Sequence, residues 1–372
     1  MASFHRSLVV QPAWRSRRAI LALAGFGLIA SACGSSSNSS ASSVTSSVSN
    51  ATSPSTSSLS SAASFFVGKT ITLIAPDAPG GGFDAYSRLI APELGKMLKA
   101  TVNVENVPGG GTITGTDKMA ASAPDGLTLG AVNVPGDIGD VLQHNTALNV
   151  SLDSLSWIGL ASPETLVMVA SNSSPYKTFA QLEKATANVK FGGSKSGISW
   201  VGGATIMRAF KIPTTFLTGY GTQTQVSQGI IANEFDVAFG DISGSFYSDL
   251  VGKKAELLLV SGPSSVPSVQ QVISGAPTSS QIISQLSGNA KAAVSEAFSL
   301  GNLGFSFAGP KGIPADRLAV LRNAFMQAVD SPSVKAQAIK ESLSLAPIDG
   351  ATLAGKIKAA LAGSGVLGPF IN

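Results

Sequence analysis

The sequence predicts an α/β protein, because a small set of patterns recurs along the chain. Apolar runs rich in β-branched residues follow one another, glycine turns come directly after several of them, and amphipathic segments separate the runs. The first run, residues 71–75, reads as a strand. Consecutive glycines at residues 80–82 come next, and residues 84–99 then read as a helix with one apolar face. This rhythm of strand, glycine turn, helix and strand is typical of a parallel α/β sheet.

The later elements follow the same order. Residues 101–107 alternate like a strand, Pro108 to Gly111 open a second helix, and residues 127–132 form a third strand. Pro92 falls inside the first helix and is expected to kink or shorten it. Further strands are expected at residues 166–170, 189–192, 235–240, 257–261 and 305–308, and a further helix at residues 315–329.

Length and charge narrow the range of functions. A chain of 372 residues has room for two domains with sizeable cores, and its single cysteine excludes an intrachain disulfide. The net charge of +4 comes from arginines in residues 1–32, a segment without an acidic residue, and the rest of the chain carries 21 basic and 21 acidic residues. A nucleic-acid partner would need a basic face, and this balance predicts none.

Residues 1–32 have the form of a secretory signal peptide, with arginines ahead of a short apolar stretch. The ending Ala30-Ser31-Ala32-Cys33 resembles a bacterial lipobox. We therefore expect Cys33 to carry lipid and to anchor the exported protein to the outer face of the cytoplasmic membrane, at the cell surface or in the periplasm. The alternative is a plain signal peptide cut near Ala32. Residues 16–21 also resemble a twin-arginine signal, so both the general secretory route and the twin-arginine route stay open.

Residues 33–65 are predicted to be a disordered, serine-rich tether. Seventeen of the 31 residues from 34 to 64 are serine, and none is charged. With so few large apolar side chains, the segment cannot offset the entropy of ordering. The folded part is therefore expected to begin near Phe65 and to be held at the membrane by a flexible linker.

The glycine triplet Gly80 to Gly82 requires a reason, because glycine loses more backbone freedom on folding than any other residue. Ligands of open α/β sheets bind where strands end and helices begin. Backbone N–H groups at Gly80 to Phe83, next to the positive end of a helix dipole, would hold an anion closely, and Asp84 is placed to cap the helix. Neither the P-loop nor the dinucleotide-binding pattern matches, so the anion need not be a phosphate. A tight turn without a ligand is the alternative.

Several motifs in order carry a resemblance to a known family. They are PGGGFD at 79–84, ENVPG at 105–109, PDGLTL at 124–129, SWIGL at 156–160, KTFAQL at 177–182, FDVAF at 235–239 and GPKGIP at 309–314. From about residue 69 onward, the chain closely resembles the substrate-binding receptors of tripartite tricarboxylate transporters, also called the Bug or TctC family.

The resemblance implies a two-domain, periplasmic-binding-protein-like fold of type II, with a ligand cleft between the domains. One domain would comprise residues 66–168 and 299–372, and the other residues 169–298. In this family, the loop after the first strand and a loop of the second domain, residues 218–223 here, hold a carboxylate through main-chain amides and bridging waters.

The ligand-binding positions follow from this resemblance and from the strand-end argument. They are Ala78, Gly80, Gly81, Gly82, Phe83, Asp84, Asn133, Ser194, Gly197, Tyr220, Gly221, Thr222 and Asp241. Asp241 would otherwise cap the segment that follows it. The chain departs from the family's pattern by lacking a lysine after Tyr220, by Asp77 and Phe83 in the first loop, and by Trp200 where a histidine is common. These departures bear on the substrate more than on the binding mode.

The resemblance implies a solute-binding lipoprotein that captures a small carboxylate and delivers it to integral-membrane transporter subunits, as a monomer and without a cofactor. A carboxylate sensor without transport, or a hydrolase-like enzyme using the same cleft, is the alternative. An enzyme is not expected, because the only histidines are His5 in the leader and His144 in a polar loop. With Cys33 committed to lipid, a His/Cys metal site cannot be assembled. A purely structural lipoprotein would not need glycine loops at two strand ends.

Overall fold

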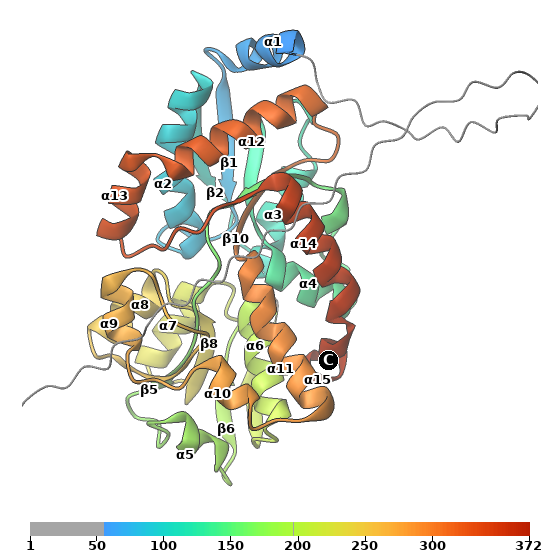
Figure 1. Cartoon of the computed structure of the whole chain (residues 1–372). Coiled ribbons are helices and arrows are strands. Elements are labelled where there is room, and N and C mark those ends of the chain that lie inside the picture. Colours follow the sequence, from blue (N-terminus) through green and yellow to red (C-terminus); the bar gives the residue numbers. More distant parts are fainter. Residues whose placement is uncertain (1–55, 196) are drawn as a thin grey trace, which may run out of the picture. The chain divides into compact units, whose positions relative to one another are not determined.

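The computed structural model describes residues 56–195 and 197–372, which belong to one compact unit with two β-sheets (Figure 1). The predicted signal peptide, Cys33 and the tether up to residue 55 lie outside the described residues. Within the described ranges, no helix is long and apolar enough to cross a membrane.

The first sheet has six strands in the order β11-β4-β10-β3-β1-β2. Its strands are β1 (Thr70–Ala75), β2 (Thr101–Asn106), β3 (Thr128–Asn133), β4 (Ser156–Leu160), β10 (Phe305–Gly309) and β11 (Ile348–Asp349). Strand β1 pairs in parallel with β2 and β3, whereas β10 runs antiparallel to both β3 and β4.

The second sheet has five strands in the order β7-β6-β8-β5-β9. Its strands are β5 (Leu166–Ser171), β6 (Val189–Gly192), β7 (Thr214–Leu217), β8 (Val237–Asp241) and β9 (Ala255–Val260). Strand β6 pairs in parallel with β7 and β8, whereas β5 runs antiparallel to β8 and β9.

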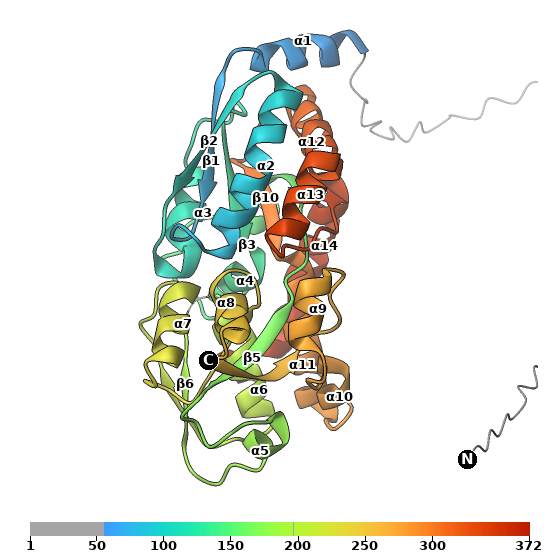
Figure 2. The same ribbon diagram turned by 90° about the vertical axis from the view of Figure 1, so that its left-hand side faces the viewer.

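The prediction of a parallel sheet is therefore correct for the strand–helix repeats and wrong for β5 and β10. The short β11 is also antiparallel to its neighbour β4. Strands β5 and β10 belong to segments by which the chain passes from one sheet to the other (Figure 2). Each starts at the edge where a parallel strand ends: Leu166 pairs with Asp241, and Phe305 pairs with Asn133. A strand that starts where its neighbours end must run antiparallel to them. The periodicity of the sequence does not indicate the direction of a strand.

Helices cover both sheets. The helices before β5 are α1 (Thr56–Phe66), α2 (Gly82–Leu98), α3 (Ile113–Ala120) and α4 (Val134–Leu142). Between β5 and β10 they are α5 (Phe179–Glu183), α6 (Ile198–Ala209), α7 (Gln223–Ile231), α8 (Ser245–Val251), α9 (Pro267–Ile273), α10 (Ser279–Ile283) and α11 (Gly288–Leu300). After β10 they are α12 (Ala315–Asp330), α13 (Pro332–Lys340), α14 (Gly350–Gly363) and α15 (Gly368–Ile371). Short 3-10 turns lie at Gly110–Thr112, Leu152–Ser154, Gly301–Leu303 and Ser364–Leu367.

Pro92 does not shorten helix α2, which continues to Leu98, one residue before the expected end. Pro92 and Arg88, the residue one turn before it, are both exposed, so the carbonyl that loses its helical partner faces water. The opposite face buries Leu89, Ile90 and Leu94 in the core. Burial of this face outweighs the local cost of the proline.

The tether prediction is corrected at its end, because α1 occupies residues 56–66. Phe66 is fully buried and packs beside Leu321 of α12 and Leu129 of β3, in one apolar cluster. Phe65 lies under the guanidinium of Arg317, at 3.5 Å from the ring centre. Two adjacent phenylalanines thus anchor a serine-rich helix that its own composition would not stabilise.

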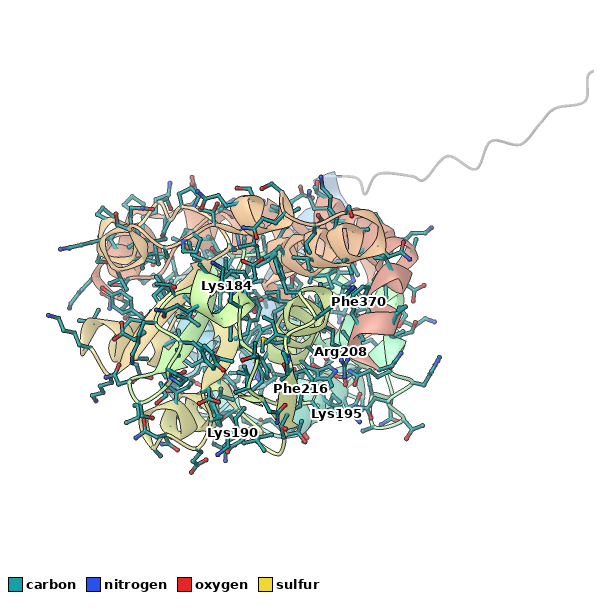
Figure 3. All side chains as sticks on the ribbon, turned by 90° about the horizontal axis from the view of Figure 1, so that it is seen from below. Lys184, Lys190, Lys195, Arg208, Phe216 and Phe370 are labelled. Atoms are coloured by element: carbon teal, nitrogen blue, oxygen red, sulfur yellow. The ribbon has the colours of Figure 1, made fainter. Side chains whose placement is uncertain are left out.

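The C-terminal helix α15 packs against α6 of the second sheet. The indole of Trp200 donates a hydrogen bond to the carbonyl of Ile371 at 2.6 Å, and Arg208 donates one to the carbonyl of Phe370. Figure 3 shows Arg208 between Phe216 and Phe370, with its guanidinium 5.0 Å from the Phe216 ring centre. The predicted domain bounds place residues 299–372 with the first sheet, and they also cut β5 at residue 168. Those bounds remain a prediction.

Candidate functional site

A pocket lies where strands of both sheets end and helices begin. Its lining includes Pro76 to Ala78 after β1, Asn133 at the end of β3 and Asp241 at the end of β8. The backbones of the two sides touch beside it: a Cβ on Gly244 would lie 3.0 Å from the carbonyl oxygen of Gly80. The cavity volume is about 90 Å³. At roughly 10–15 Å³ for each water position, this space holds about six to nine water-sized groups, the size of a small metabolite.

The structure brings most of the predicted ligand-binding residues to this pocket. Ala78, Gly81, Gly82, Phe83, Asn133, Ser194, Gly197, Gly221, Thr222 and Asp241 line it. Gly80, Asp84 and Tyr220 do not. The hydroxyl of Tyr220 donates to Glu234 at 2.6 Å, and its ring packs on Phe235, so this side chain is held away from the pocket.

The start of α2 is satisfied from within the chain. The carboxylate of Asp77 accepts hydrogen bonds from the backbone N–H groups of Phe83 and Asp84, both at 3.0 Å. The N–H of Gly80 donates to Asp84 Oδ2 at 2.9 Å, and that of Gly81 donates to the carbonyl of Ala78 at 3.0 Å. Most of the amides that were expected to hold a ligand anion therefore have an internal acceptor.

The prediction that Asp84 caps α2 is wrong. The N-cap residue is Gly81, and the carboxylate that satisfies the first turn comes from Asp77. Asp84 instead accepts from the side chain of Asn106 at 2.8 Å and pairs with Arg88 at 2.8 Å. Adjacency in the sequence favoured Asp84 as the cap, but the turn at Gly80, with φ +86°, folds the earlier carboxylate over the helix end.

The starts of two other helices also line the pocket. They are Gly197 to Ser199 at α6 and Thr222 to Thr224 at α7. The N–H groups in the first turn of a helix have no partner inside the helix and carry partial positive charge. Thr222 caps α7 by accepting from the N–H of Gln225, while Gly197 at the start of α6, with φ +102°, makes no side-chain cap. Helices α6 and α7 therefore offer the anion-binding ends that α2 lacks.

Three carboxyl groups line the same pocket: Asp77, Glu164 and Asp241. Burial raises the pKa of Asp77 to about 7, opposed by its hydrogen bond from Phe83 and reinforced by the negative charge of Asp84. Burial raises the pKa of Asp241 to about 6, against the hydrogen bond that the backbone N–H of Ser243 donates to its carboxylate. Burial, then the charge of Asp241, raises the pKa of Glu164 well above its ordinary value. Among the described residues, the lining contains no lysine, arginine or histidine.

Three buried polar atoms in the lining make no hydrogen bond within the described protein. They are Thr112 Oγ1, Glu164 Oε2 and Ser243 Oγ. Buried polar groups are normally paired, and an unpaired one is costly. A ligand with matching hydrogen-bonding groups could satisfy such atoms in the residues that line a pocket.

Sequence reasoning did not identify Thr112, Glu164 or Ser243 as site residues. Asp77 differs from the family's pattern, and this difference was the one sequence feature that pointed to Asp77. Glu164 lies in the loop between β4 and β5, with no motif around it. It reaches the pocket because the chain crosses between the sheets there. His144 is exposed, and no group of three or more His, Cys, Asp or Glu side chains in the described ranges is placed to hold a metal ion.

Residues 86–242 match the model of the tripartite tricarboxylate transporter family receptor. Over shorter stretches the chain is similar to curated bacterial proteins. It is 33% identical over 110 residues to protein BugT of Bordetella pertussis, which covers 29% of this chain and 33% of BugT. It is 29% identical over 143 residues to the UPF0065 protein in the TAR-I ttuE-ttuC' intergenic region of Agrobacterium vitis, covering 37% of this chain and 41% of that protein. The chain thus spans less than half the length of the curated relatives it matches.

Solved structures share the fold over most of the chain. The structure of MatC from Rhodopseudomonas palustris with bound malate is 20% identical, with a TM-score of 0.63, covering 80% of this chain and 99% of MatC. The periplasmic binding protein BugD is 17% identical, with a TM-score of 0.65, covering 80% of this chain and 96% of BugD. These findings confirm the resemblance to the receptor family and the two-domain, periplasmic-binding-protein-like fold.

Proposed function

We propose that this chain, a relative of the tripartite tricarboxylate transporter receptors, is an extracytoplasmic solute receptor that captures a small carboxylate. One observation carries the proposal: a small pocket at the strand ends of both sheets gathers the first turns of α6 and α7. Such turns favour a negatively charged group. The malate that is bound in the MatC structure is a carboxylate of suitable size.

The binding energy of such a site fits a receptor. Hydrogen bonds to a charged group contribute about 1.5–3 kcal/mol each, and a micromolar affinity requires about 8 kcal/mol. Two or three amides from α6 and α7 therefore supply around half of that free energy. Burial of the remaining ligand surface between the two sheets would supply the rest, and the side chains that face this surface would set specificity.

The receptor would be held at the membrane and would deliver its solute to integral-membrane transporter subunits. We infer lipidation of Cys33, because this residue ends the apolar part of the leader and precedes a serine-rich segment. The protein would act as a monomer without a cofactor and without enzymatic activity. Replacement by Cys33→Ala should move the protein from the membrane fraction to the soluble fraction. Retention of the variant in the membrane fraction would refute the anchor.

A screen of carboxylates by thermal shift tests the receptor function itself. A ligand that binds only the folded protein raises the melting temperature through mass action. We expect small carboxylates to raise it, and Gly82→Ala to abolish the rise. A Cβ on Gly82 would lie 2.8 Å from Ser243 Oγ and 3.0 Å from the Phe305 ring, and so would narrow the pocket. If no small carboxylate shifts the melting temperature, the proposed function fails.

A further inference from the structure

Two buried carboxyl groups form one wall of the pocket. Glu164 lies just before β5 and is 7% exposed, and Asp241 ends β8 and is 5% exposed. The two positions are adjacent in the backbone, because the N–H of Ile242 donates to the carbonyl of Thr165 at 2.8 Å and Leu166 pairs with Asp241. Negative charge on Asp241 also raises the pKa of Glu164. The two groups therefore lie close enough to interact.

The Glu164 side chain is fixed in place by the backbone around it. Its own N–H donates to the carbonyl of Gly301 at 2.9 Å, and a Cβ on Gly304 would lie 2.5 Å from Glu164 Cγ. Yet Glu164 Oε2 has no hydrogen-bond donor within the described protein, although Glu164 is one of the residues that line the pocket. A buried acceptor without a partner is costly, and a donor on the cavity's occupant would satisfy it.

Ser243 adds a second acceptor beside this pair. Its N–H donates to Asp241 Oδ1 at 2.7 Å, which fixes the residue next to the carboxyl group. Its hydroxyl oxygen is buried, lines the pocket and makes no hydrogen bond among the described residues. The hydroxyl also lies near Gly82 at the start of α2. Ser243 thus lies between the carboxyl pair and a helix start.

The pocket lining therefore contains groups suited to a negative charge and groups suited to a positive charge. The first turns of α6 and α7, helices of 12 and 9 residues, present partial positive charge. Glu164 and Asp241 are acidic groups that ionise only at a cost in this buried site, and the described lining has no basic side chain to pair with their carboxylates. A metal ion does not resolve this, because no cluster of three or more metal-ligating side chains lies within the described residues.

We propose that the solute is a small zwitterion, whose carboxylate is held by the starts of α6 and α7 and whose protonated amine is held by Glu164, Asp241 and Ser243. The carboxylate half of this inference rests on the proposed function, and the amine half rests on the orphaned oxygen atoms. An ammonium group brings three N–H donors and one positive charge, which match acceptors on Glu164, Asp241 and Ser243. A dicarboxylate would instead place its second negative charge against two carboxyl groups.

Matched pairs of probes separate these ligand classes. L-alanine and L-lactate differ only in an amine against a hydroxyl group, and γ-aminobutyrate and succinate differ in an amine against a second carboxylate. Binding to the full chain is measured by calorimetry at neutral pH without divalent cations. We expect the amine-bearing member of at least one pair to bind roughly 10- to 100-fold more tightly, as a hydrogen-bonded charge pair would give.

A charge-removing variant with a matched control ties the effect to the site. Glu164→Gln keeps the shape of the side chain and should remove that preference for the amine. Glu256→Gln makes the same chemical change at an exposed position of β9 and should leave it intact. Melting temperature is recorded for both variants. Glu164→Gln should not lower it, because the variant removes a buried, unpaired carboxyl group.

The outcomes distinguish this inference from the proposed function. If succinate or L-lactate binds and neither amine probe does, the zwitterion is refuted and the carboxylate receptor stands. Binding of n-butylamine as tightly as γ-aminobutyrate would remove the carboxylate handle and leave the amine site. A carboxylate that binds only with added Mg²⁺, or equal amine preference in Glu164→Gln and the parent, overturns the amine site. So does the absence of binding by both amine probes.

Discussion

The start of α2 and the starts of α6 and α7 meet at one pocket but differ in how their amides are used. At α2, Asp77 and Asp84 accept from the loop's own N–H groups. At α6, the N-cap residue Gly197 has no side chain to cap the first turn, and at α7 the Thr222 side chain accepts from the N–H of Gln225. A glycine triplet therefore does not by itself make an open anion site. A helix start can bind an anion only where its N–H groups do not already donate to an acidic side chain of the same chain.

The largest expected effect comes from disturbing the internal cap. A Cβ on Gly81 would lie 2.1 Å from Asp77 Oδ2, so Gly81→Val must displace the carboxylate that satisfies two buried amides. We expect the free energy of unfolding to fall by about 2–3 kcal/mol, measured by urea denaturation. Gly355→Val, at an exposed position of α14 with open space around it, is the control. Equal stability of Gly81→Val and the parent would show that Asp77 does not cap α2.

Dependence of stability on pH follows from the buried carboxyl groups. The pKa of Asp77 is about 7 and that of Asp241 about 6 in the folded protein, against an ordinary value of 3.8. Between these values the folded state binds more protons than the unfolded state, so stability should fall as pH rises from about 4 to about 7. The charged group that acts on Asp77 is Asp84, which itself pairs with Arg88. The titratable groups that interact with Asp241 are Glu164 and Tyr86.

Denaturation curves across that range check the sign, and Asp77→Asn should flatten the slope by removing one titrating group. A stability that rises with pH through this window would mean that the carboxyl groups are paired with positive charge. Such a result would also weaken the contrast between the two kinds of helix start.

A smaller effect on the fold and a larger one on binding are expected at α6. Gly197 has φ +102°, a conformation that side chains rarely adopt, so Gly197→Ala should cost about 1–2 kcal/mol of stability. It should also weaken binding of a carboxylate by about tenfold, as loss of one charged hydrogen bond would. The control is Gly68→Ala, because Gly68 also has a positive φ, of +71°, has no neighbour within 4 Å and lies outside the pocket lining. Affinity that falls equally in both variants would point to global strain.

The smallest effect is expected from Asp84→Asn. The Asp84 carboxylate accepts hydrogen bonds from Gly80 and Asn106 and forms an ion pair with Arg88, but Asp84 does not line the pocket. We expect a loss of stability of about 1 kcal/mol or less, since Arg88 is largely exposed, and no change in affinity. A clear loss of affinity without loss of stability would return Asp84 to the ligand site and make the α2 start comparable to the others.

Much of the fold could be read from local pattern. Strand β1 was placed within one residue and α12 ended one residue later than expected, because periodicity and burial agree there. The family resemblance led to Gly197 and Thr222, which line the pocket, and Asp241, which no motif marks, also lines it. The antiparallel direction of β5 and β10 could not be predicted from the sequence, since it depends on the chain crossing from one sheet to the other.

The resemblance to the receptor family implied the two-domain architecture, and the sequence by itself determined the alternation of strands and helices and the glycine-rich turns at strand ends. These features depend on neighbours along the chain, and so they leave a local pattern. Only the tertiary structure decided which amides stay open and which charges meet. Asp77 folds back over α2, and the crossover between the sheets brings Glu164 to the pocket that Asp241 also lines. Contacts between residues that are distant along the chain set the electrostatics of the pocket, and no local period records them.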